Sequence, residues 1–312
     1  MNRATLSIVI PTYNTAAMTL AACRAVRAAA GTAEVIVVDD GSTDGTQELL
    51  AAELPDVRVL RLEVNHRFAA AANAGVAAAT CPLTLLLNSD ALVDPGTVNA
   101  LIAAFDDPRL GVAGARLVNS DGTPQWSGGP LPTLAWLTVL AGGFAVLLPR
   151  RGHSTPNVGW VSGAAMAFRR AVWDAAGPLR EDYLFYAQDV DFCARASDAG
   201  WEVRIVEEAR VVHQGGATMR QWRDVAELPH DPAFLWLDLL AWGRERYGPW
   251  WATTARALMA AAALMRIAAR RLRELLLRGE ERSRSRSTTA AYAAALQQLL
   301  VKRQQPARKS IG

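Results

Sequence analysis

The sequence predicts an α/β protein: a doubly wound, mostly parallel β-sheet flanked by helices, followed by a C-terminal amphipathic helical extension. Short apolar, β-branched runs alternate with helix-forming segments, which is the pattern of a parallel sheet with right-handed crossover connections. The charge also changes along the chain, because residues 1–243 carry 18 basic and 26 acidic side chains whereas residues 244–312 carry 15 and 4. With 312 residues and a 51% hydrophobic composition, the chain can form a large core and an appendage.

The elements of the sheet follow in order along the chain. Over the first 90 residues we expect strands at 6–10, 34–40 and 57–62, and a fourth strand that starts at 83 and leads into NSD at 88–90. Between them we expect a helix at 15–30, a second helix that ends at 52, and a third at 69–79. Beyond them we expect a helix ending near 105, strands at 110–118, 160–169 and 201–206, a short helix at 170–176 and a helix from 188 to about 200. Such a sheet gathers the loops after its strands at one crevice, where nucleotides commonly bind.

One uncharged segment raises the question of a membrane span. Residues 122–149 contain no charged side chain, and LPTLAWLTVLAGGFAVLLP at 131–149 has about the length of a transmembrane helix. Two glycines interrupt it, prolines bound it, and the alternation of strands and acidic clusters resumes after it, so a span would divide the sheet between two compartments. We therefore expect a helix that packs in the core or faces a membrane.

The basic C-terminal part predicts a membrane-associating extension. A helix is expected over 252–278, and at about 100° per residue one face of it collects Leu264, Ala268, Leu272 and Leu275. The opposite face carries arginines at positions 266, 270 and 273. With WLDLLAW and YGPWW just before it, this helix resembles an interfacial anchor, and RSRSRST after Arg282 predicts a flexible linker. We expect three parts: an acidic body at 1–220, a helical membrane-associating extension at 221–281, and a basic flexible linker and tail at 282–312.

Cysteine usage and the N-terminus indicate the compartment. Cys23, Cys81 and Cys193 form neither a metal-knuckle spacing nor an even disulfide framework, which favours a reducing cytoplasm. The N-terminus reaches an apolar strand within a few residues and lacks the features of a signal peptide. We expect a cytoplasmic body, peripheral on the inner face of the cell membrane, where the basic extension meets anionic lipid.

Three clusters of acidic and amide side chains carry the chemistry: DDGS at 39–42, NSD at 88–90 and QDVD at 188–191. The first two follow strand ends, so their side chains can act on a single ligand. Grouped carboxylates are costly unless a cation or a substrate proton balances them, which indicates metal-assisted handling of a phosphate ester with one carboxylate as base. DDGS is equally compatible with turn and cap chemistry, and IPTYN at 10–14 with a strand-to-helix turn capped by Asn14.

In this order, IPTYN, VVDDGSTDGT, NHRFAAAANAG and LLLNSD resemble the nucleotide-binding half of family 2 glycosyltransferases, which have the GT-A fold. The resemblance continues through WVSGAAMAFRR, FYAQDVDFCARASDAGW and VVHQGG and covers about the first 220 residues, so that the acidic body corresponds to the catalytic domain. Within the family, the chain looks most like bacterial rhamnosyltransferase-like enzymes of surface polysaccharide assembly. The absence of GxGxxG, GxxxxGK[ST] and G-x-S-x-G motifs argues against dinucleotide, P-loop and hydrolase chemistry.

The resemblance implies a role for each motif residue. Those implied at the nucleotide are Pro11, Tyr13, Asp39, Asp40, Arg67, Asn73, Asn88 and Ser89. NSD takes the place of the family's Asp-x-Asp, and its first member is an amide here, which leaves Asp90 as the main carboxylate for Mg²⁺ or Mn²⁺ on the sugar diphosphate. His213 matches the family's late metal-binding histidine, a ligand that Mn²⁺ tolerates better than Mg²⁺.

The resemblance also implies that Asp189 is the catalytic base, with Gln188 in place of the usual acidic residue. The expected activity is an inverting transfer of a sugar, best matched by rhamnose or a related hexose, from a nucleoside diphosphate to a hydroxyl of a glycan or lipid-linked acceptor. Two alternatives stay open: a sugar-phosphate nucleotidyltransferase, which would release pyrophosphate, and a non-catalytic scaffold that binds nucleotide sugars. The amides at 88 and 188 keep the second alternative open.

Overall fold

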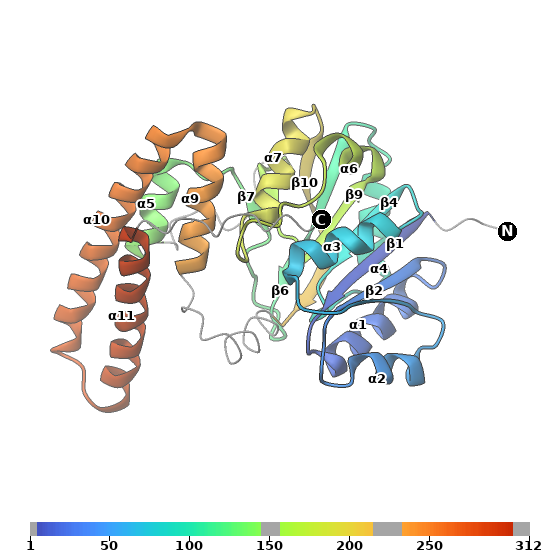
Figure 1. Ribbon diagram of the computed structural model, residues 1–312, viewed down its shortest axis with the longest axis horizontal. Coiled ribbons are helices and arrows are strands. Elements are labelled where there is room, and N and C mark those ends of the chain that lie inside the picture. Colours follow the sequence, from blue (N-terminus) through green and yellow to red (C-terminus); the bar gives the residue numbers. More distant parts are fainter. Residues whose placement is uncertain (1–4, 145–156, 215–232, 302–312) are drawn as a thin grey trace. The chain divides into compact units, whose positions relative to one another are not determined.

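The computed structural model describes residues 5–144, 157–214 and 233–301 (Figure 1). The chain divides into two compact units. The first consists of residues 1–131 and 149–226, and the second of residues 132–148 and 227–312. The domain boundary expected near residue 220 falls in 215–232, outside the described residues.

An eight-stranded mixed sheet forms the centre of the first unit (Figure 1). Its order is β3 (Arg58–Leu62), β2 (Glu34–Asp40), β1 (Leu6–Thr12), β4 (Leu83–Leu87), β9 (Ala165–Arg169), β6 (Leu110–Val118), β10 (Glu202–His213) and β5 (Ala91–Leu92). Strand β1 pairs in parallel with β2 and β4, β2 with β3, and β6 with β10, whereas β9 lies antiparallel between β4 and β6. A second, two-stranded sheet pairs β7 (Gly128–Gly129) with β8 (Trp160–Val161). The expected doubly wound, mostly parallel α/β class is confirmed.

Helices flank this sheet as the alternating pattern predicted. They are α1 (Ala16–Ala29), α2 (Thr46–Glu53), α3 (Arg67–Ala78), α4 (Pro95–Ala104), α6 (Arg170–Ala176) and α7 (Gln188–Asp198). Helix α3 lies against β1 and β2. A Cβ atom at Gly75 of α3 would come within 2.3 Å of the Val9 side chain and 2.8 Å of the Val38 side chain. The close approach of helix and sheet therefore needs a glycine there, although glycine weakens a helix by about 1 kcal/mol relative to alanine.

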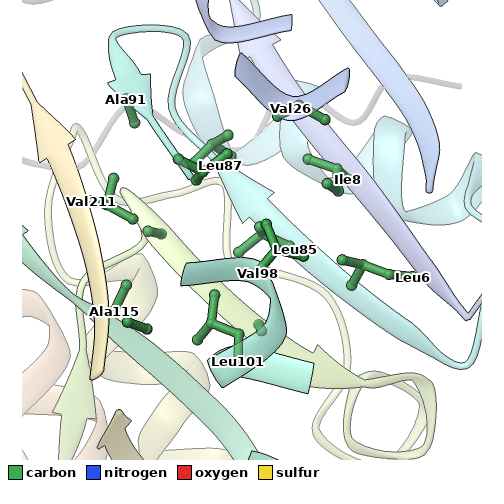
Figure 2. Packing of buried hydrophobic residues seen from close by; sticks show 14 of the residues in the cluster. Leu6, Ile8, Val26, Leu85, Leu87, Ala91, Val98, Leu101, Ala115 and Val211 are labelled. Carbon is green, nitrogen blue, oxygen red and sulfur yellow. The ribbon is translucent and has the colours of Figure 1, made fainter. Parts of the chain in front are cut away.

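The hydrophobic core lies around β4, all five residues of which are buried. Figure 2 shows Leu85 and Leu87 of β4 with Ile8 of β1 and Val26 of α1 on one side and Val98 of α4 near them. A strand covered on both faces has no polar face to present to water, which is why four of the five residues of LTLLL are leucines and its threonine, Thr84, is buried as well.

The second unit is helical, with α5 (Leu134–Gly142), α9 (Ala233–Tyr247), α10 (Pro249–Glu274) and α11 (Gly279–Leu300). Helix α10 packs against the other three. The side chains of Trp236 and Trp242 in α9 are almost fully buried. A Cβ atom at Gly243 would lie 1.9 Å from the ring of Trp251, so a glycine is required for α9 to approach α10.

The uncharged segment contributes a short core helix. Nine-residue α5 is about 14 Å long, too short to cross a bilayer, and Trp136, Leu137 and Leu140 on it are buried. Of the two possibilities left open by the sequence, a core helix or a membrane-facing helix, the described part of the segment therefore forms a core helix. Residues 145–149 of the segment lie outside the described residues. Segment 132–148 groups with the C-terminal helices instead of belonging to one continuous body at 1–220. In the described part of the chain, α10 is the helix long and apolar enough to cross a membrane, by length and composition.

The segment after Arg282, expected to be a flexible linker, is part of helix α11 in the structure. Glu274, which is 3% exposed, accepts hydrogen bonds from Thr289 Oγ1 at 2.6 Å and Ser285 Oγ at 3.3 Å. Leu299 near the end of α11 is fully buried. The polar Ser/Thr/Arg run therefore folds because its hydroxyls satisfy a buried carboxylate and its apolar end packs, and these tertiary contacts outweigh a composition typical of a linker.

Candidate active site

A cavity of about 280 Å³ opens where the parallel strands β1, β2 and β4 end. Its walls combine nine of the residues expected at the site: Pro11, Tyr13, Asp40, Arg67, Asn88, Ser89, Asp90, Asp189 and His213. Parallel strands carry their following loops to the same edge, which explains how the first two clusters meet. The third cluster reaches the same cavity from the start of α7. The remaining two expected residues, Asp39 and Asn73, do not line this cavity.

The two adjacent carboxylates of the first cluster have separate tasks. Asp39 is fully buried, accepts a hydrogen bond from the Ser42 amide at 2.9 Å through Oδ1, and pairs through Oδ2 with Arg61. Asp40 faces the cavity and accepts a hydrogen bond from the His66 amide at 2.8 Å. Burial raises the pKa of Asp40, and backbone N–H donors oppose that shift. Asp39 thus supports the loop, while Asp40 is the carboxylate of the two that lines the cavity.

Residues at the start of α3 form a second wall. Arg67 has the left-handed φ of 74°, and its amide donates to Asn65 Oδ1 at 3.0 Å. Asn73 turns away from the cavity: its Nδ2 donates to the Leu179 carbonyl at 2.9 Å and its Oδ1 accepts from the Leu179 amide at 3.0 Å. Asn73, which the resemblance implies at the nucleotide, therefore fastens the segment at 179 and does not line the cavity.

The NSD cluster meets His213 because β5 pairs antiparallel with the end of β10, with Ala91 opposite His213. Asp90 Oδ1 lies 3.2 Å from His213 Nε2, and Asn88 Nδ2 lies 3.2 Å from the same nitrogen. Ser89 is buried, and its hydroxyl bonds that of Thr15 at 2.9 Å. The carboxylate oxygen of Asp90 and the imidazole Nε2 of His213 therefore face each other where β5 and β10 pair.

This pair fits a divalent cation. With metal–ligand distances of about 2.1 Å, neighbouring ligands of a six-coordinate ion lie roughly 3 Å apart, close to the Asp90–His213 separation of 3.2 Å. Within the described ranges, no group of three or more His, Cys, Asp or Glu side chains could hold a metal. A cation held here would take further oxygen ligands from a diphosphate or from water.

Asp189 stands at the first turn of α7, opposite the NSD cluster. Its Oδ2 accepts from the Gly163 amide at 3.0 Å and its Oδ1 from the Val190 amide at 2.8 Å, so the carboxylate is fixed in orientation. Ala187, with a left-handed φ of 70°, turns the chain into the helix just before it. Burial raises the pKa of Asp189, and the two amides oppose that rise. A buried, oriented carboxylate with a raised pKa is suited to accept a proton.

Several cavity residues escaped the sequence interpretation. They are Thr12, Asn65, Phe68, Ala71, Ser162, Gly163, Ala164, Phe185 and Tyr186. All of them lie inside the motifs that carry the family resemblance, but no role was assigned to them individually. Gln125 lies behind the cavity, where its Oε1 is 2.8 Å from His213 Nδ1. It is 88 positions from the histidine, and no motif marked it.

Comparison with known proteins agrees with this geometry. The N-acetylglucosaminyl-diphospho-decaprenol L-rhamnosyltransferase of Mycobacterium tuberculosis is 28% identical over 249 residues, which cover 71% of this chain and 78% of that protein. Among solved structures, mannosyltransferase PcManGT from Pyrobaculum calidifontis, in complex with GDP-Man and Mn²⁺, matches with a TM-score of 0.54 at 20% identity over 97% of this chain and 89% of its own. GalNAc-T7 with UDP, GalNAc and Mn²⁺ matches with a TM-score of 0.53 at 17% identity over 72% of this chain and 48% of its own.

These two structures share the GT-A fold with this chain. Residues 7–173, more than half of the sequence, match the family described as glycosyl transferase family 2. The match spans β1 to α6 and includes the ends of β1, β2 and β4, where the cavity lies. The chain therefore belongs to glycosyl transferase family 2 and is a glycosyltransferase.

Proposed function

We propose that the protein is an inverting, divalent-metal-dependent hexosyltransferase of cell-surface polysaccharide synthesis. It moves a sugar, rhamnose or a related hexose, from a nucleoside diphosphate to a hydroxyl of a glycan or lipid-linked acceptor. The observation that carries the proposal is that Asp189 lines the same cavity as Asp40, Asp90 and His213. The likeness to a rhamnosyltransferase named for a lipid-linked N-acetylglucosaminyl diphosphate supports the choice of sugar and acceptor.

Asp189 acts as the base. As the acceptor hydroxyl attacks the anomeric carbon, a new carbon–oxygen bond forms and the hydroxyl proton passes to Asp189. The bond from the anomeric carbon to the diphosphate breaks, and its electron pair leaves with the diphosphate. Attack opposite the leaving group inverts the anomeric configuration. The Gly163 and Val190 amides hold the carboxylate in place for this transfer.

The donor occupies the other side of the cavity. Asp40 accepts hydrogen bonds from the nucleoside, and the ring of Tyr13 packs on the base. Asp90 and His213 would hold Mg²⁺ or Mn²⁺ at the diphosphate, with the Asn88 amide beside them. When bound, such an ion supplies positive charge that offsets the charge developing on the departing diphosphate.

Replacement of Asp189 by Asn tests the proposal. The amide keeps the size of the side chain but is a far weaker base, so we expect the transfer rate to fall by about 10²- to 10⁴-fold while nucleoside diphosphate binding stays. Asp191→Asn is the matched control, because Asp191 lies on the same helix, pairs with Arg195 at 2.8 Å and does not line the cavity. Normal transfer by Asp189→Asn would refute the assignment, and release of pyrophosphate by the wild type would favour a nucleotidyltransferase.

The outward face of α10 supports binding to a membrane surface. Six large apolar side chains on this face and at its C-terminal end are 55–86% exposed: Trp250, Leu264, Met265, Leu272, Leu275 and Leu276. The opposite face packs within the unit through Ala255, Met259 and Ala263, and the guanidinium of Arg266 lies 3.5 Å from the centre of the Tyr292 ring. A helix in contact with water alone normally exposes a polar face and not a row of large apolar side chains.

Basic side chains adjoin this apolar face. Three arginines and one carboxylate line a cavity of about 420 Å³ beside Leu272 and Leu275: Arg271, Arg282, Arg286 and Glu274, which pairs with Arg271 at 3.5 Å. Guanidinium groups pair well with phosphate oxygens, and a basic side chain near an anionic bilayer contributes about 1 kcal/mol to binding. We therefore infer that the second unit binds the anionic lipid of the inner membrane face, where a lipid-linked acceptor would be available.

A further inference from the structure

The Gln125 side chain makes two hydrogen bonds to His213 and one to Asn119. Its Nε2 donates to the His213 backbone carbonyl at 2.5 Å and to Asn119 Oδ1 at 2.6 Å, and its Oε1 lies 2.8 Å from His213 Nδ1. Gln125 sits on the chain segment that returns after the turn at 119–122, and Val118 and Pro124 bridge across this turn. The amide is thus held between the end of β6 and the end of β10.

The orientation of this amide follows from its partners. A backbone carbonyl can only accept a hydrogen bond, so the Nε2 end of Gln125 must face the His213 carbonyl. Its Oε1 then faces His213 Nδ1, and an amide oxygen has only lone pairs to offer. The proton of this hydrogen bond therefore belongs to Nδ1 of the imidazole.

A second set of hydrogen bonds independently fixes the orientation of the Gln125 amide. Asp121 Oδ1 accepts from the Thr123 hydroxyl at 2.6 Å, and that hydroxyl accepts from Asn119 Nδ2 at 2.8 Å. The Oδ1 of Asn119 is then turned toward Gln125, whose Nε2 must donate to it. From the Asp121 carboxylate to the imidazole, each donor and acceptor is determined.

We propose that Gln125 is a positioning residue that holds His213 in the tautomer with the proton on Nδ1. In that tautomer Nε2 keeps its lone pair, and Nε2 is the nitrogen that lies 3.2 Å from Asp90 Oδ1. Gln125 thereby presents the imidazole to a divalent cation shared with Asp90, in the way that outer partners of metal-ligating histidines fix the ring. This inference rests on the proposed function of the Asp90–His213 pair.

The test distinguishes an effect of Gln125 on the imidazole of His213 from a general loosening of the turn at 119–122. Gln125→Met keeps the size of the side chain but removes the acceptor for Nδ1, together with the two hydrogen bonds that Nε2 donates. Thr123→Val is the matched control, because it removes a hydroxyl that bonds Asp121 and Asn119 in the same turn but no atom of the three Gln125 hydrogen bonds. The His213 carbonyl still fixes the direction of the Gln125 amide in this variant. Two quantities are measured: the tautomer of His213 by ¹⁵N NMR of imidazole-labelled protein at a pH where the ring is neutral, and the affinity for Mn²⁺ alone by electron paramagnetic resonance.

We expect the wild type and Thr123→Val to carry the proton on Nδ1. Gln125→Met should populate the other tautomer and bind Mn²⁺ about 10- to 100-fold more weakly. A wild-type proton on Nε2 overturns the inference whether or not the variant folds, and so does unchanged Mn²⁺ affinity in Gln125→Met. A wild type that has the expected tautomer and binds Mn²⁺ but transfers no sugar would refute the proposed function and leave this inference standing.

Discussion

Asp39 and Asp40 are neighbours with different environments, since one is enclosed by protein donors and the other faces the cavity. We expect Asp40→Asn to weaken nucleoside diphosphate binding by about 10- to 100-fold, the value of a hydrogen bond to a charged group, with little change in stability. Asp39→Asn should instead lower the free energy of unfolding by about 1–3 kcal/mol, because it leaves Arg61 without its buried partner. Calorimetric titration and urea unfolding measure the two effects. Equal effects of the two variants on binding would contradict this division.

The pH dependence of transfer should report Asp189. Burial raises the pKa of this carboxyl group, so the base becomes protonated, and transfer is lost, as pH falls through a value above the ordinary pKa of about 3.9. Because the pKa of Asp189 is higher in the folded than in the unfolded state, ionisation of this group lowers the free energy of unfolding. This loss of stability is absent below the unfolded-state pKa and grows as pH rises toward the folded-state pKa. The profile of kcat/KM against pH measures the acidic limb. An acidic limb with an apparent pKa at or below the ordinary aspartate value would contradict the assignment of Asp189 as the base.

At the scale of elements, α10 differs from the other helices because its apolar side faces outward. We expect Leu272→Glu with Leu276→Glu to weaken binding to vesicles of phosphatidylglycerol and phosphatidylcholine by about 10²-fold, since two large apolar side chains no longer enter the lipid. Leu300→Glu, an equally exposed leucine on α11, is the matched control and should bind like the wild type. Vesicle co-sedimentation measures the binding.

A second copy of the chain is the competing occupant of the α10 face. Wild-type protein that ignores anionic vesicles but dimerises, together with a monomeric double variant, would show that a protein covers this face and would refute lipid binding. Point variants are preferable to removal of the C-terminal helices, because Trp136, Leu137 and Leu140 of α5 are buried in the unit that those helices form. A truncated chain would expose them and aggregate for reasons unrelated to membranes.

At the scale of the whole molecule, the sheet was largely predictable from sequence. The VIVV part of β2 and most of β4 are apolar because their strands are covered on both faces, and this signal is local. Loops at strand ends converge by topology, which is why Asp40 and Asp90 could be assigned to one cavity before their distances were known. Asp189, at the start of α7, was assigned to the site through the resemblance to family 2 glycosyltransferases. The unexpected helix α11 depends on contacts with α10 that composition does not record.

The sequence alone determined the family, the fold class and the residue types gathered at the cavity, because strand periodicity and motif order are properties of short segments. Only the tertiary structure separated Asp40 from Asp39 and turned Asn73 away from the cavity. It also brought Gln125 to His213 across 88 positions. Hydrogen-bond partners and burial depend on which segments meet in space, and a chain read in order carries no local signal of them.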